Sequence, residues 1–293
     1  MDGKEFRSGF VAVAGRPNVG KSTLLNTLVG RKVAIVSDKP QTTRACLAGI
    51  LTLDRAQVVF VDTPGVHRPR HLLNDRMVKS ALNSVKDADL VLFVAQGAPG
   101  KGDRSVLVGL GSAPVFLVIN KVDLLTKPGL LPVIDAWRRE GNFAEIIPVS
   151  AKTGENLDRL VGLVVRYLPS GPPYYPSTTV SDRPEEFLLG ELVREKVLLL
   201  TGQEVPHTVA VVVEEKRSRP DGTLYLRAVV YTEKETQRAI LIGRGGAMLK
   251  KVGTASRREM EEFLGTKVYL DLWVKVKEDW RNREEYLRIF GYE

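Results

Sequence analysis

The sequence predicts an α/β domain, with a mostly parallel sheet and helices on both faces, followed by a small α+β domain. From residue 10 onward, short apolar runs alternate with segments of helical periodicity, a pattern typical of parallel sheets. The order of elements changes after a proline-rich segment. The length of 293 residues agrees with two domains, since single domains usually hold about 100 to 200 residues.

The strands of the first domain are predicted from apolar runs that end in polar or glycine-containing turns. They are FVAVAG, ACLAGILTL, QVVFVDTPG, DLVLFVAQ, PVFLVINKVD and AEIIPVSAK. The helix KSTLLNTLVG follows the first run, and the amphipathic helix NLDRLVGLVVRYL closes the domain. Ligands of open α/β sheets bind outside the carboxyl ends of the strands, so we expect the chemistry along that edge.

The proline-rich segment PSGPPYYPSTTVSDRP makes a continued helix or a central strand unfavourable at this place in the chain. We therefore expect a first domain at residues 1–172, a linker at 173–183, and a second domain with a C-terminal extension at 184–293. The second domain is predicted to hold the helix EEFLLGELVREKVLLL, the strands HTVAVVVEE and TLYLRAVVY, a helix, a glycine-rich loop, a helix and the strand KVYLDLWVKV.

Composition narrows the class of protein. No run reaches the roughly 18 to 20 apolar residues of a membrane-spanning helix, and the first ten residues lack a secretory signal, so we expect a cytosolic protein. The lone cysteine, Cys46, lies in a predicted strand and excludes an intramolecular disulfide framework. The formal net charge of +8 favours a polyanionic partner.

A phosphate-binding loop, GRPNVGKST, is predicted between the first strand and the first helix. Its glycines let backbone N–H groups face phosphates, Lys21 neutralises the β and γ oxygens, and Ser22 ligates Mg²⁺. The predicted phosphate-binding residues are Gly15, Arg16, Pro17, Asn18, Val19, Gly20, Lys21, Ser22 and Thr23, with Gly65 from a later turn.

Two later segments are predicted to complete this site. Asp62 follows the strand QVVFV and is placed to hold Mg²⁺ through water, while Gly65 offers its N–H to the γ-phosphate. The predicted switch segment contains Gln41, Thr42 and Thr43, and we favour Thr43 over Thr42 as the residue that joins the magnesium shell. The predicted magnesium ligands are therefore Ser22, Thr43 and Asp62.

The motifs NKVD and SAK predict recognition of guanine. The carboxylate of Asp123 can accept paired hydrogen bonds from guanine N1–H and the 2-amino group, a donor pair that adenine lacks. The segment SAK can bring a backbone N–H toward the guanine O6. The predicted guanine-binding residues are Asn120, Lys121, Asp123, Ser150, Ala151 and Lys152. Together these motifs predict a P-loop GTPase domain that binds GTP and GDP with Mg²⁺.

The position after Gly65 holds Val66, where many GTPases have a glutamine that orients the attacking water. Hydrolysis is therefore expected to be slow or to depend on a different catalytic group. One hypothesis is that Asn18 helps to hold a monovalent cation, K⁺, near the phosphates; the other is that Asn18 only stabilises the loop.

The glycine-rich loop in ILIGRGGAMLK predicts a nucleic-acid site. KH domains clamp a single-stranded backbone with a Gly-x-x-Gly loop between two helices, although such a loop is also a common turn. Residues 238–283 hold 11 Lys and Arg against 6 Asp and Glu. The predicted RNA-binding residues combine a groove wall, the close-approach glycines and basic charge: Ile240, Ile242, Gly243, Arg244, Gly245, Gly246, Lys250 and Lys251.

Nearly the whole chain resembles the Era-like GTPase family of the TrmE-Era-EngA class, bacterial GTPases with a C-terminal type II KH domain. The resemblance rests on GRPNVGKST, QTTR, DTPGVH, NKVD, SAK, VSDRPEEF, ILIGRGGAMLK and LDLWVKVKEDW. It implies slow GTP hydrolysis and binding of the 3′ end of 16S ribosomal RNA during assembly of the small ribosomal subunit and rRNA maturation. It also implies peripheral membrane association in some members. We expect a monomer.

One segment departs from the family pattern. Ala95 and Gln96 stand where many relatives have an acidic residue, and Lys101, Gly102 and Asp103 follow. We expect this difference to alter surface chemistry and to leave the nucleotide site intact. Two other functions stay open: an RNA chaperone with a structural nucleotide site and negligible turnover, and a P-loop GTPase that acts on another RNA or a protein.

Overall fold

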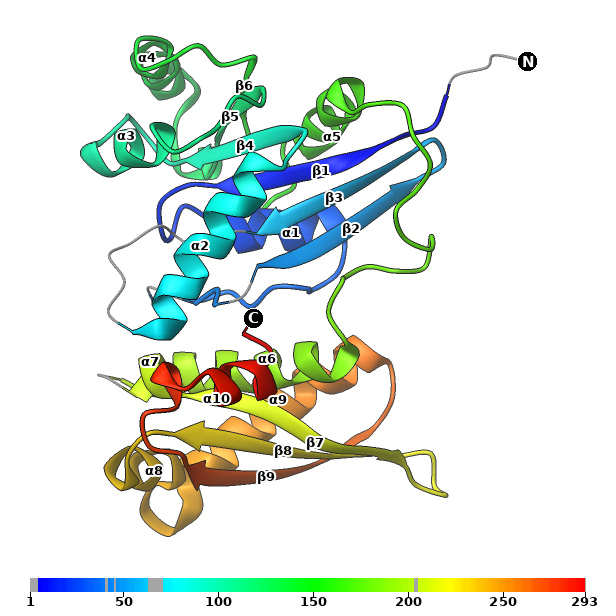
Figure 1. Cartoon of the computed structure of the whole chain (residues 1–293), viewed down its shortest axis with the longest axis vertical. Helices are drawn as coiled ribbons and strands as arrows, with labels where there is room; N and C mark the ends of the chain where they lie inside the picture. Colours follow the sequence, from blue (N-terminus) through cyan, green and yellow to red (C-terminus); the bar gives the residue numbers. More distant parts are fainter. Residues whose placement is uncertain (1–4, 40–41, 45, 63–70, 203–204, 293) are drawn as a thin grey trace. The chain divides into compact units, whose positions relative to one another are not determined.

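The computed structural model describes residues 5–39, 42–44, 46–62, 71–202 and 205–292 (Figure 1). By their contacts these residues form two compact units. Unit 1 lies within Met1–Ala34, Thr43–Arg68 and Met77–Asp182. Unit 2 lies within Ile35–Thr42, Pro69–Arg76 and Arg183–Glu293.

Unit 1 is built on a six-stranded sheet in the order β2-β3-β1-β4-β5-β6. Only β2 runs antiparallel to its neighbour, so the predicted mostly parallel sheet is confirmed. The strands are β1 (Arg7–Ala14), β2 (Leu47–Leu53), β3 (Ala56–Asp62), β4 (Leu90–Ala95), β5 (Val115–Ile119) and β6 (Glu145–Pro148). The helices are α1 (Lys21–Val29), α3 (Lys101–Leu107), α4 (Lys127–Arg138) and α5 (Leu157–Tyr167), with the short η1 (Val122–Leu124). Helix α2 (Leu72–Lys86) belongs to this unit from Met77 onward, whereas its first residues group with unit 2.

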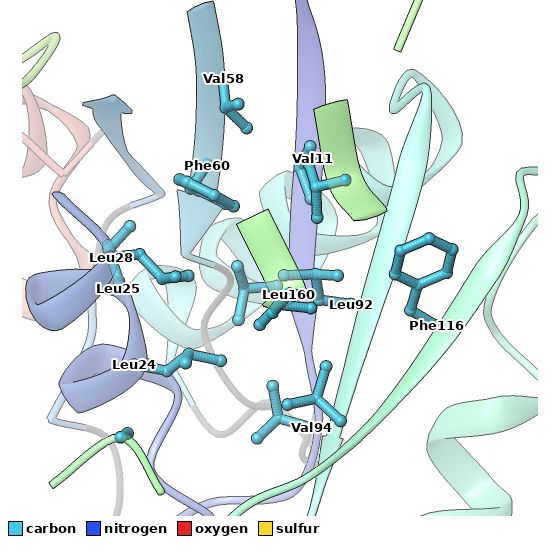
Figure 2. Packing of buried hydrophobic residues seen from close by; sticks show 14 of the residues in the cluster. Val11, Leu24, Leu25, Leu28, Val58, Phe60, Leu92, Val94, Phe116 and Leu160 are labelled. Carbon is cyan, nitrogen blue, oxygen red and sulfur yellow. The ribbon is translucent and has the colours of Figure 1, made fainter. Parts of the chain in front are cut away.

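The central strands are buried on both faces, which explains their continuous apolar runs. On one face, side chains of β1, β3 and β4 pack against α1 and α5 (Figure 2). The labelled residues of this cluster include Val11, Phe60, Leu92, Leu24 and Leu160. On the other face, β4 and β5 pack against α3 and α4. The two-sided packing holds the carboxyl ends of the strands in fixed positions for the site.

Unit 2 contains a three-stranded sheet in the order β7-β8-β9. The strands are β7 (Ala210–Ser218), β8 (Leu224–Thr232) and β9 (Val268–Val276), with β8 antiparallel to β7 and parallel to β9. The helices are α6 (Glu185–Leu200), α7 (Val205–Thr208), α8 (Glu235–Ile242), α9 (Ala247–Leu264) and α10 (Glu284–Ile289), with the short η2 (Arg244–Gly246) and η3 (Trp280–Asn282). The predicted order of helix, two strands, two helices and strand is confirmed, whereas α7, η3 and α10 were not predicted.

The sheet of unit 2 has one face packed against α6 and α9, where Leu226, Ala228 and Val230 of β8 are buried in the core. Side chains of a strand alternate between faces, so Tyr225 and Tyr231 point to the opposite face. There the ring of Tyr231 stacks on Phe290, which follows α10, with 4.8 Å between the centroids. The C-terminal segment therefore contacts one end of this outer face.

Residues 35–42 group with unit 2 although unit 1 surrounds them in sequence. Helix α6 holds both ends of this segment. The buried carboxylate of Glu195 accepts a hydrogen bond from the Val36 N–H at 2.8 Å, and the buried guanidinium of Arg194 donates to the Thr42 carbonyl at 2.5 Å. No helix among the described residues is both long and apolar enough to span a membrane.

Candidate functional site

The loop between β1 and α1 depends on backbone conformations that favour glycine. Gly15 has a φ of 150° and Gly20 a φ of 97°. A Cβ atom at Gly15 would lie 2.3 Å from the Val94 carbonyl oxygen, and one at Gly20 would lie 2.4 Å from Asn120 Nδ2. Asn18, between them, also has a left-handed φ of 64°. These residues therefore form a tight loop at the start of α1, and the first N–H groups of a helix, which lack partners within the helix, can bind an anion.

Lys21 opens α1 and is held inside this loop. Its Nζ donates hydrogen bonds to the carbonyls of Gly15 at 3.0 Å and Arg16 at 2.9 Å. Burial lowers the pKa of Lys21, and the nearby carboxylate of Asp62 acts in the opposite direction. A buried ammonium with backbone partners is a fixed positive charge at the position where the motif requires a phosphate contact.

Three side-chain oxygens meet beside Lys21. Ser22 Oγ donates to Asp62 Oδ2 at 2.8 Å, Thr43 Oγ1 donates to the same atom at 3.2 Å, and the two hydroxyl oxygens are 3.2 Å apart. The hydroxyl of Thr42 points elsewhere and donates to the Lys39 carbonyl at 2.6 Å. The structure thus brings together the three predicted magnesium ligands.

The environment of Asp62 fits a hard divalent cation. Its carboxylate is fully buried, and among the described residues its Oδ1 has no hydrogen-bond partner. Burial raises the pKa of Asp62, while Lys21 and the two hydroxyls lower it. Mg²⁺ prefers oxygen ligands and would favour the charged form of this carboxylate. Binding of Mg²⁺ by these residues stays a prediction.

The motifs NKVD and SAK are joined to the phosphate loop by hydrogen bonds. Asn120 Nδ2 donates to the Val19 carbonyl at 2.9 Å, and Asn120 Oδ1 accepts from the Ala151 N–H at 2.9 Å. Ser150 Oγ donates to Asp123 Oδ1 at 2.6 Å. The Asp123 carboxylate is therefore oriented before any base arrives, as a base-reading group requires.

Lysine side chains flank this region. Lys121 has a left-handed φ of 63°, and its Nζ donates to the Asn18 carbonyl at 2.8 Å. Lys152 is exposed. The remaining predicted residues of the loop, Pro17 and Thr23, lie before α1 and in its first turn. Three residues of the prediction, Gln41, Gly65 and Val66, lie outside the described residues.

The segment that departs from the family pattern contacts the phosphate loop. Asp103 is fully buried, and its Oδ1 accepts a hydrogen bond from Arg16 Nε at 2.6 Å. Its Oδ2 accepts from the Gly100 N–H at 2.9 Å. The expectation that this segment alters surface chemistry is therefore wrong for Asp103, because the carboxylate caps the start of α3 and fixes an arginine of the loop.

The Gly-x-x-Gly loop connects α8 to α9. Gly243, Gly245 and Gly246 have φ values of 72°, 56° and 77°. A Cβ atom at Gly243 would lie 2.9 Å from the Met248 backbone nitrogen. The loop therefore requires glycine, and Arg244 within it is exposed.

A groove of ≈ 340 Å³ lies beside this loop. Its lining combines small, basic and apolar residues: Gly246, Leu249, Lys250, Gly253, Thr254, Arg257, Leu270 and Leu272. Of the predicted RNA-binding residues, only Gly246 and Lys250 line it. Sequence reasoning missed the other lining residues, although the alternation of Leu270 and Leu272 in β9 was a readable signal.

Ile240 and Ile242, predicted as the wall of the groove, are placed elsewhere. Helix α8 ends at Ile242, which packs against the core of unit 2, and Ile240 is 46% exposed. The prediction assumed that the apolar run before the glycines faces one groove. In a helix, neighbouring residues point in different directions, so this run is divided between core and solvent. Lys251, in the first turns of α9, is exposed.

Two families match the chain. A family described as "50S ribosome-binding GTPase" matches residues 10–121, and one described as "KH domain" matches residues 204–281. GTPase Era of Lactobacillus helveticus (strain DPC 4571) is 50% identical over 296 residues, which cover 100% of this chain and 98% of that protein. The chain belongs to the Era GTPase family.

Solved structures of Era agree over the same extent. An Aquifex aeolicus Era variant bound to GDP and AlF₄⁻ gives a TM-score of 0.93 at 40% identity, with 98% of this chain and 99% of that chain covered. Era in complex with MgGDPNP and nucleotides 1506–1542 of 16S ribosomal RNA gives a TM-score of 0.92 with the same identity and coverage. The predicted family and fold class, a P-loop GTPase domain followed by a KH domain, are confirmed.

Proposed function

We propose that this member of the Era family is a cytoplasmic, monomeric GTP switch. It binds the 3′ end of 16S ribosomal RNA through its KH domain and assists small-subunit assembly and rRNA maturation. The observation that carries the proposal is the presence, in one chain, of the oriented phosphate and guanine residues and of a Gly-x-x-Gly groove with basic walls. The Era complex with 16S ribosomal RNA nucleotides supports the choice of RNA. The proposed domains are residues 1–172 and 184–293, joined by the linker 173–183.

Different residues of the site are proposed to bind the phosphates, the base and the metal ion of GTP. Lys21 and the backbone N–H groups of the loop bind phosphate oxygens, Asp123 reads the base, and Ser22, Thr43 and Asp62 hold Mg²⁺. When bound, Mg²⁺ neutralises charge that develops on the phosphates. Val66 has no group that orients water, so the proposed hydrolysis is slow.

Coupling between nucleotide and RNA is proposed to cross the peptide bond between Thr42 and Thr43. These adjacent residues belong to different units. The Thr43 hydroxyl lies at the magnesium site of unit 1, and the Thr42 carbonyl is held by Arg194 of unit 2. A nucleotide that moves Thr43 therefore also displaces the adjoining segment that α6 binds. We propose that this displacement favours one state of the KH unit.

RNA affinity in three nucleotide states tests this function. A fluorescent single-stranded RNA with the sequence of the 16S 3′ end is titrated with the protein bound to a GTP analogue, to GDP, or to neither. We expect the affinity with the analogue to be higher than with GDP by about 5- to 150-fold, the usual range of allosteric coupling. Equal affinity in all three states would contradict a coupled switch.

Substitution Lys21→Ala tests turnover. Loss of this buried ammonium should lower multiple-turnover GTP hydrolysis by at least about 100-fold, because a fixed positive charge near the transferred phosphate stabilises the transition state. The control is Lys127→Ala, an exposed lysine at the start of α4. Negligible hydrolysis by the wild-type protein would instead favour the RNA chaperone with a structural nucleotide site.

The choice of monovalent cation tests Asn18. If its side chain helps to hold K⁺ near the phosphates, exchange of NaCl for KCl at equal ionic strength should raise single-turnover hydrolysis by at least about ten-fold. Asn18→Ala should remove this increase. Asn156→Ala is the matched control, because Asn156 also has a left-handed φ, of 61°, in a loop before a different helix. Equal rates in both salts would reject the hypothesis.

A further inference from the structure

The outer face of the unit 2 sheet carries aromatic rings beyond the end that the C-terminal segment contacts at Tyr231. Tyr225 of β8 and Tyr269 of β9 stand opposite each other in register, and their rings stack with centroids 5.8 Å apart and an interplanar angle of 15°. Trp273 lies on the same face of β9 as Tyr269. We name Tyr225, Tyr269 and Trp273, with Arg217 and Arg219, the aromatic face.

Guanidinium groups lie over the two tyrosine rings. The Cζ atom of Arg219 is 4.2 Å from the centroid of Tyr269 and 5.2 Å from that of Tyr225, and Arg217 Cζ is 4.7 Å from the Tyr225 centroid. Arginine over an aromatic ring gives a stack of planar groups that carries positive charge, which Glu215 partly offsets here through an ion pair with Arg217 at 2.9 Å. The same combination binds unpaired nucleobases in single-strand-binding proteins, where the rings stack bases and arginine attracts the backbone.

The aromatic face is open where a ligand would need it. Tyr225 is only 5% exposed beneath the arginines, but Tyr269 is 51% and Trp273 54% exposed. Large side chains half exposed on the same strand face cost hydrophobic stabilisation unless something covers them. Tyr269 and Trp273 are about 13 Å apart along the strand, at about 3.3 Å per residue. Between them the Asp271 carboxylate accepts from the Tyr225 hydroxyl at 2.9 Å and pairs with Arg227 at 3.4 Å. One base can therefore stack on Trp273 and another on the guanidinium of Arg219, which lies over Tyr269.

Strand β9 connects this face with the groove of the Gly-x-x-Gly loop. It is an edge strand, with β8 as its partner. Leu270 and Leu272 line the groove, whereas Tyr269 and Trp273 alternate with them on the opposite face. A strand of RNA that leaves the groove and passes the edge of β9 meets these rings next.

We propose that the aromatic face is a second RNA-binding surface, which stacks unpaired bases that flank the nucleotides in the groove. The inference rests on the proposed RNA-binding function of the KH unit. A protein partner is a weaker match, because the rings of Tyr225 and Tyr269 lie beneath guanidinium groups and the surface continues from the proposed RNA groove. The occupant is single-stranded RNA.

Two RNAs of different length separate the aromatic face from the groove. A KH groove holds about four nucleotides, so one RNA has about four and the other about twelve, with the same central sequence. On the longer RNA, Tyr269→Ala and Trp273→Ala should each weaken binding by about five-fold or more, the usual effect of losing one base stack. On the shorter RNA both should change affinity by less than about two-fold. The control is Tyr174→Ala, a tyrosine 55% exposed in unit 1.

Tryptophan fluorescence gives a direct readout. Trp137 and Trp280 are fully buried, so Trp273 is the tryptophan that acrylamide quenches most readily. The longer RNA should protect this emission from acrylamide, and the shorter RNA should not. Trp273→Phe, which keeps an aromatic ring, should retain most of the affinity for the longer RNA.

The outcomes distinguish the role of the aromatic face from the RNA-binding function proposed for the KH unit. If Lys250→Ala weakens both RNAs while the Tyr269 and Trp273 variants bind the longer RNA normally, the proposed RNA-binding function stands and the aromatic face is overturned. Equal loss on both RNAs also overturns it, because the rings then only support the groove. A wild-type protein that binds neither RNA overturns both proposals.

Discussion

Asp123→Asn is expected to lower GTP affinity by about 10⁴-fold and to create a preference for xanthine nucleotides. Ser150 Oγ donates to Asp123 Oδ1 at 2.6 Å, a bond that an asparagine Oδ1 can keep. The new Nδ2 then occupies the position of Oδ2 and presents a donor to the two guanine donors. A site that recognises its ligand by hydrogen bonds discriminates against a mismatched ligand by a factor of about 10⁴ to 10⁵. Xanthine carries a carbonyl in place of the 2-amino group and accepts from the amide.

The measurement is competition of GTP and XTP against a fluorescent nucleotide. Asp135→Asn serves as the control, since Asp135 lies on α4 in an exposed ion pair with Arg138 and should leave both affinities unchanged. Undiminished GTP affinity in Asp123→Asn would mean that this carboxylate does not read the base.

Arg194→Ala is expected to destabilise unit 2 by about 3 to 5 kcal/mol, the usual cost of breaking a buried ion pair. The guanidinium is fully buried and donates to Glu191 through Nε at 2.6 Å and Nη2 at 2.5 Å. Its Nη2 also donates to the Thr42 carbonyl. Removal of the guanidinium leaves the Glu191 carboxylate and the Thr42 carbonyl without these donors, and it leaves a cavity beside α6.

A comparison of two ion pairs with the same spacing sharpens this test. Arg138 and Asp135 are also three residues apart on a helix, but their side chains are 66% and 59% exposed. Arg138→Ala should therefore cost no more than about 0.5 kcal/mol. Urea denaturation gives the free energies of unfolding, and hydrogen exchange of α6 peptides assigns the loss to unit 2. Equal effects of the two substitutions would contradict a structural role for the buried pair.

Most of the residues predicted to bind the nucleotide lie close together in the structure, because their motifs are local. In GRPNVGKST the glycines, the lysine and the hydroxyl are neighbours, and the parallel sheet brings Asp62 and Asn120 to the same edge. Thr43 was harder to distinguish from Thr42, since both are threonines in a polar segment. The structure separates them by direction, with one hydroxyl on Asp62 and the other on the Lys39 carbonyl.

Features that join distant parts of the chain were not predictable from local pattern. Asp103 reads as a surface residue because its partner, Arg16, lies 87 residues away. The hydrogen bond between Arg194 and Thr42 spans 152 residues, and that between Glu195 and Val36 spans 159. The groove beside the predicted loop is lined by residues of α9 and β9 and not by Ile240 or Ile242, since periodicity does not show which side of α8 faces the glycines.

The grouping of residues 35–42 with unit 2 bears on how the protein can be divided. A fragment that ends in the linker would keep the switch segment but lose Glu195 and Arg194, which bind its backbone at Val36 and Thr42. The two units therefore cannot be separated by a single cut in the linker, because the cut removes the α6 side chains that bind residues 36 and 42. A GTPase domain taken alone would carry a switch segment without its support, and its hydrolysis rate would not represent the intact protein.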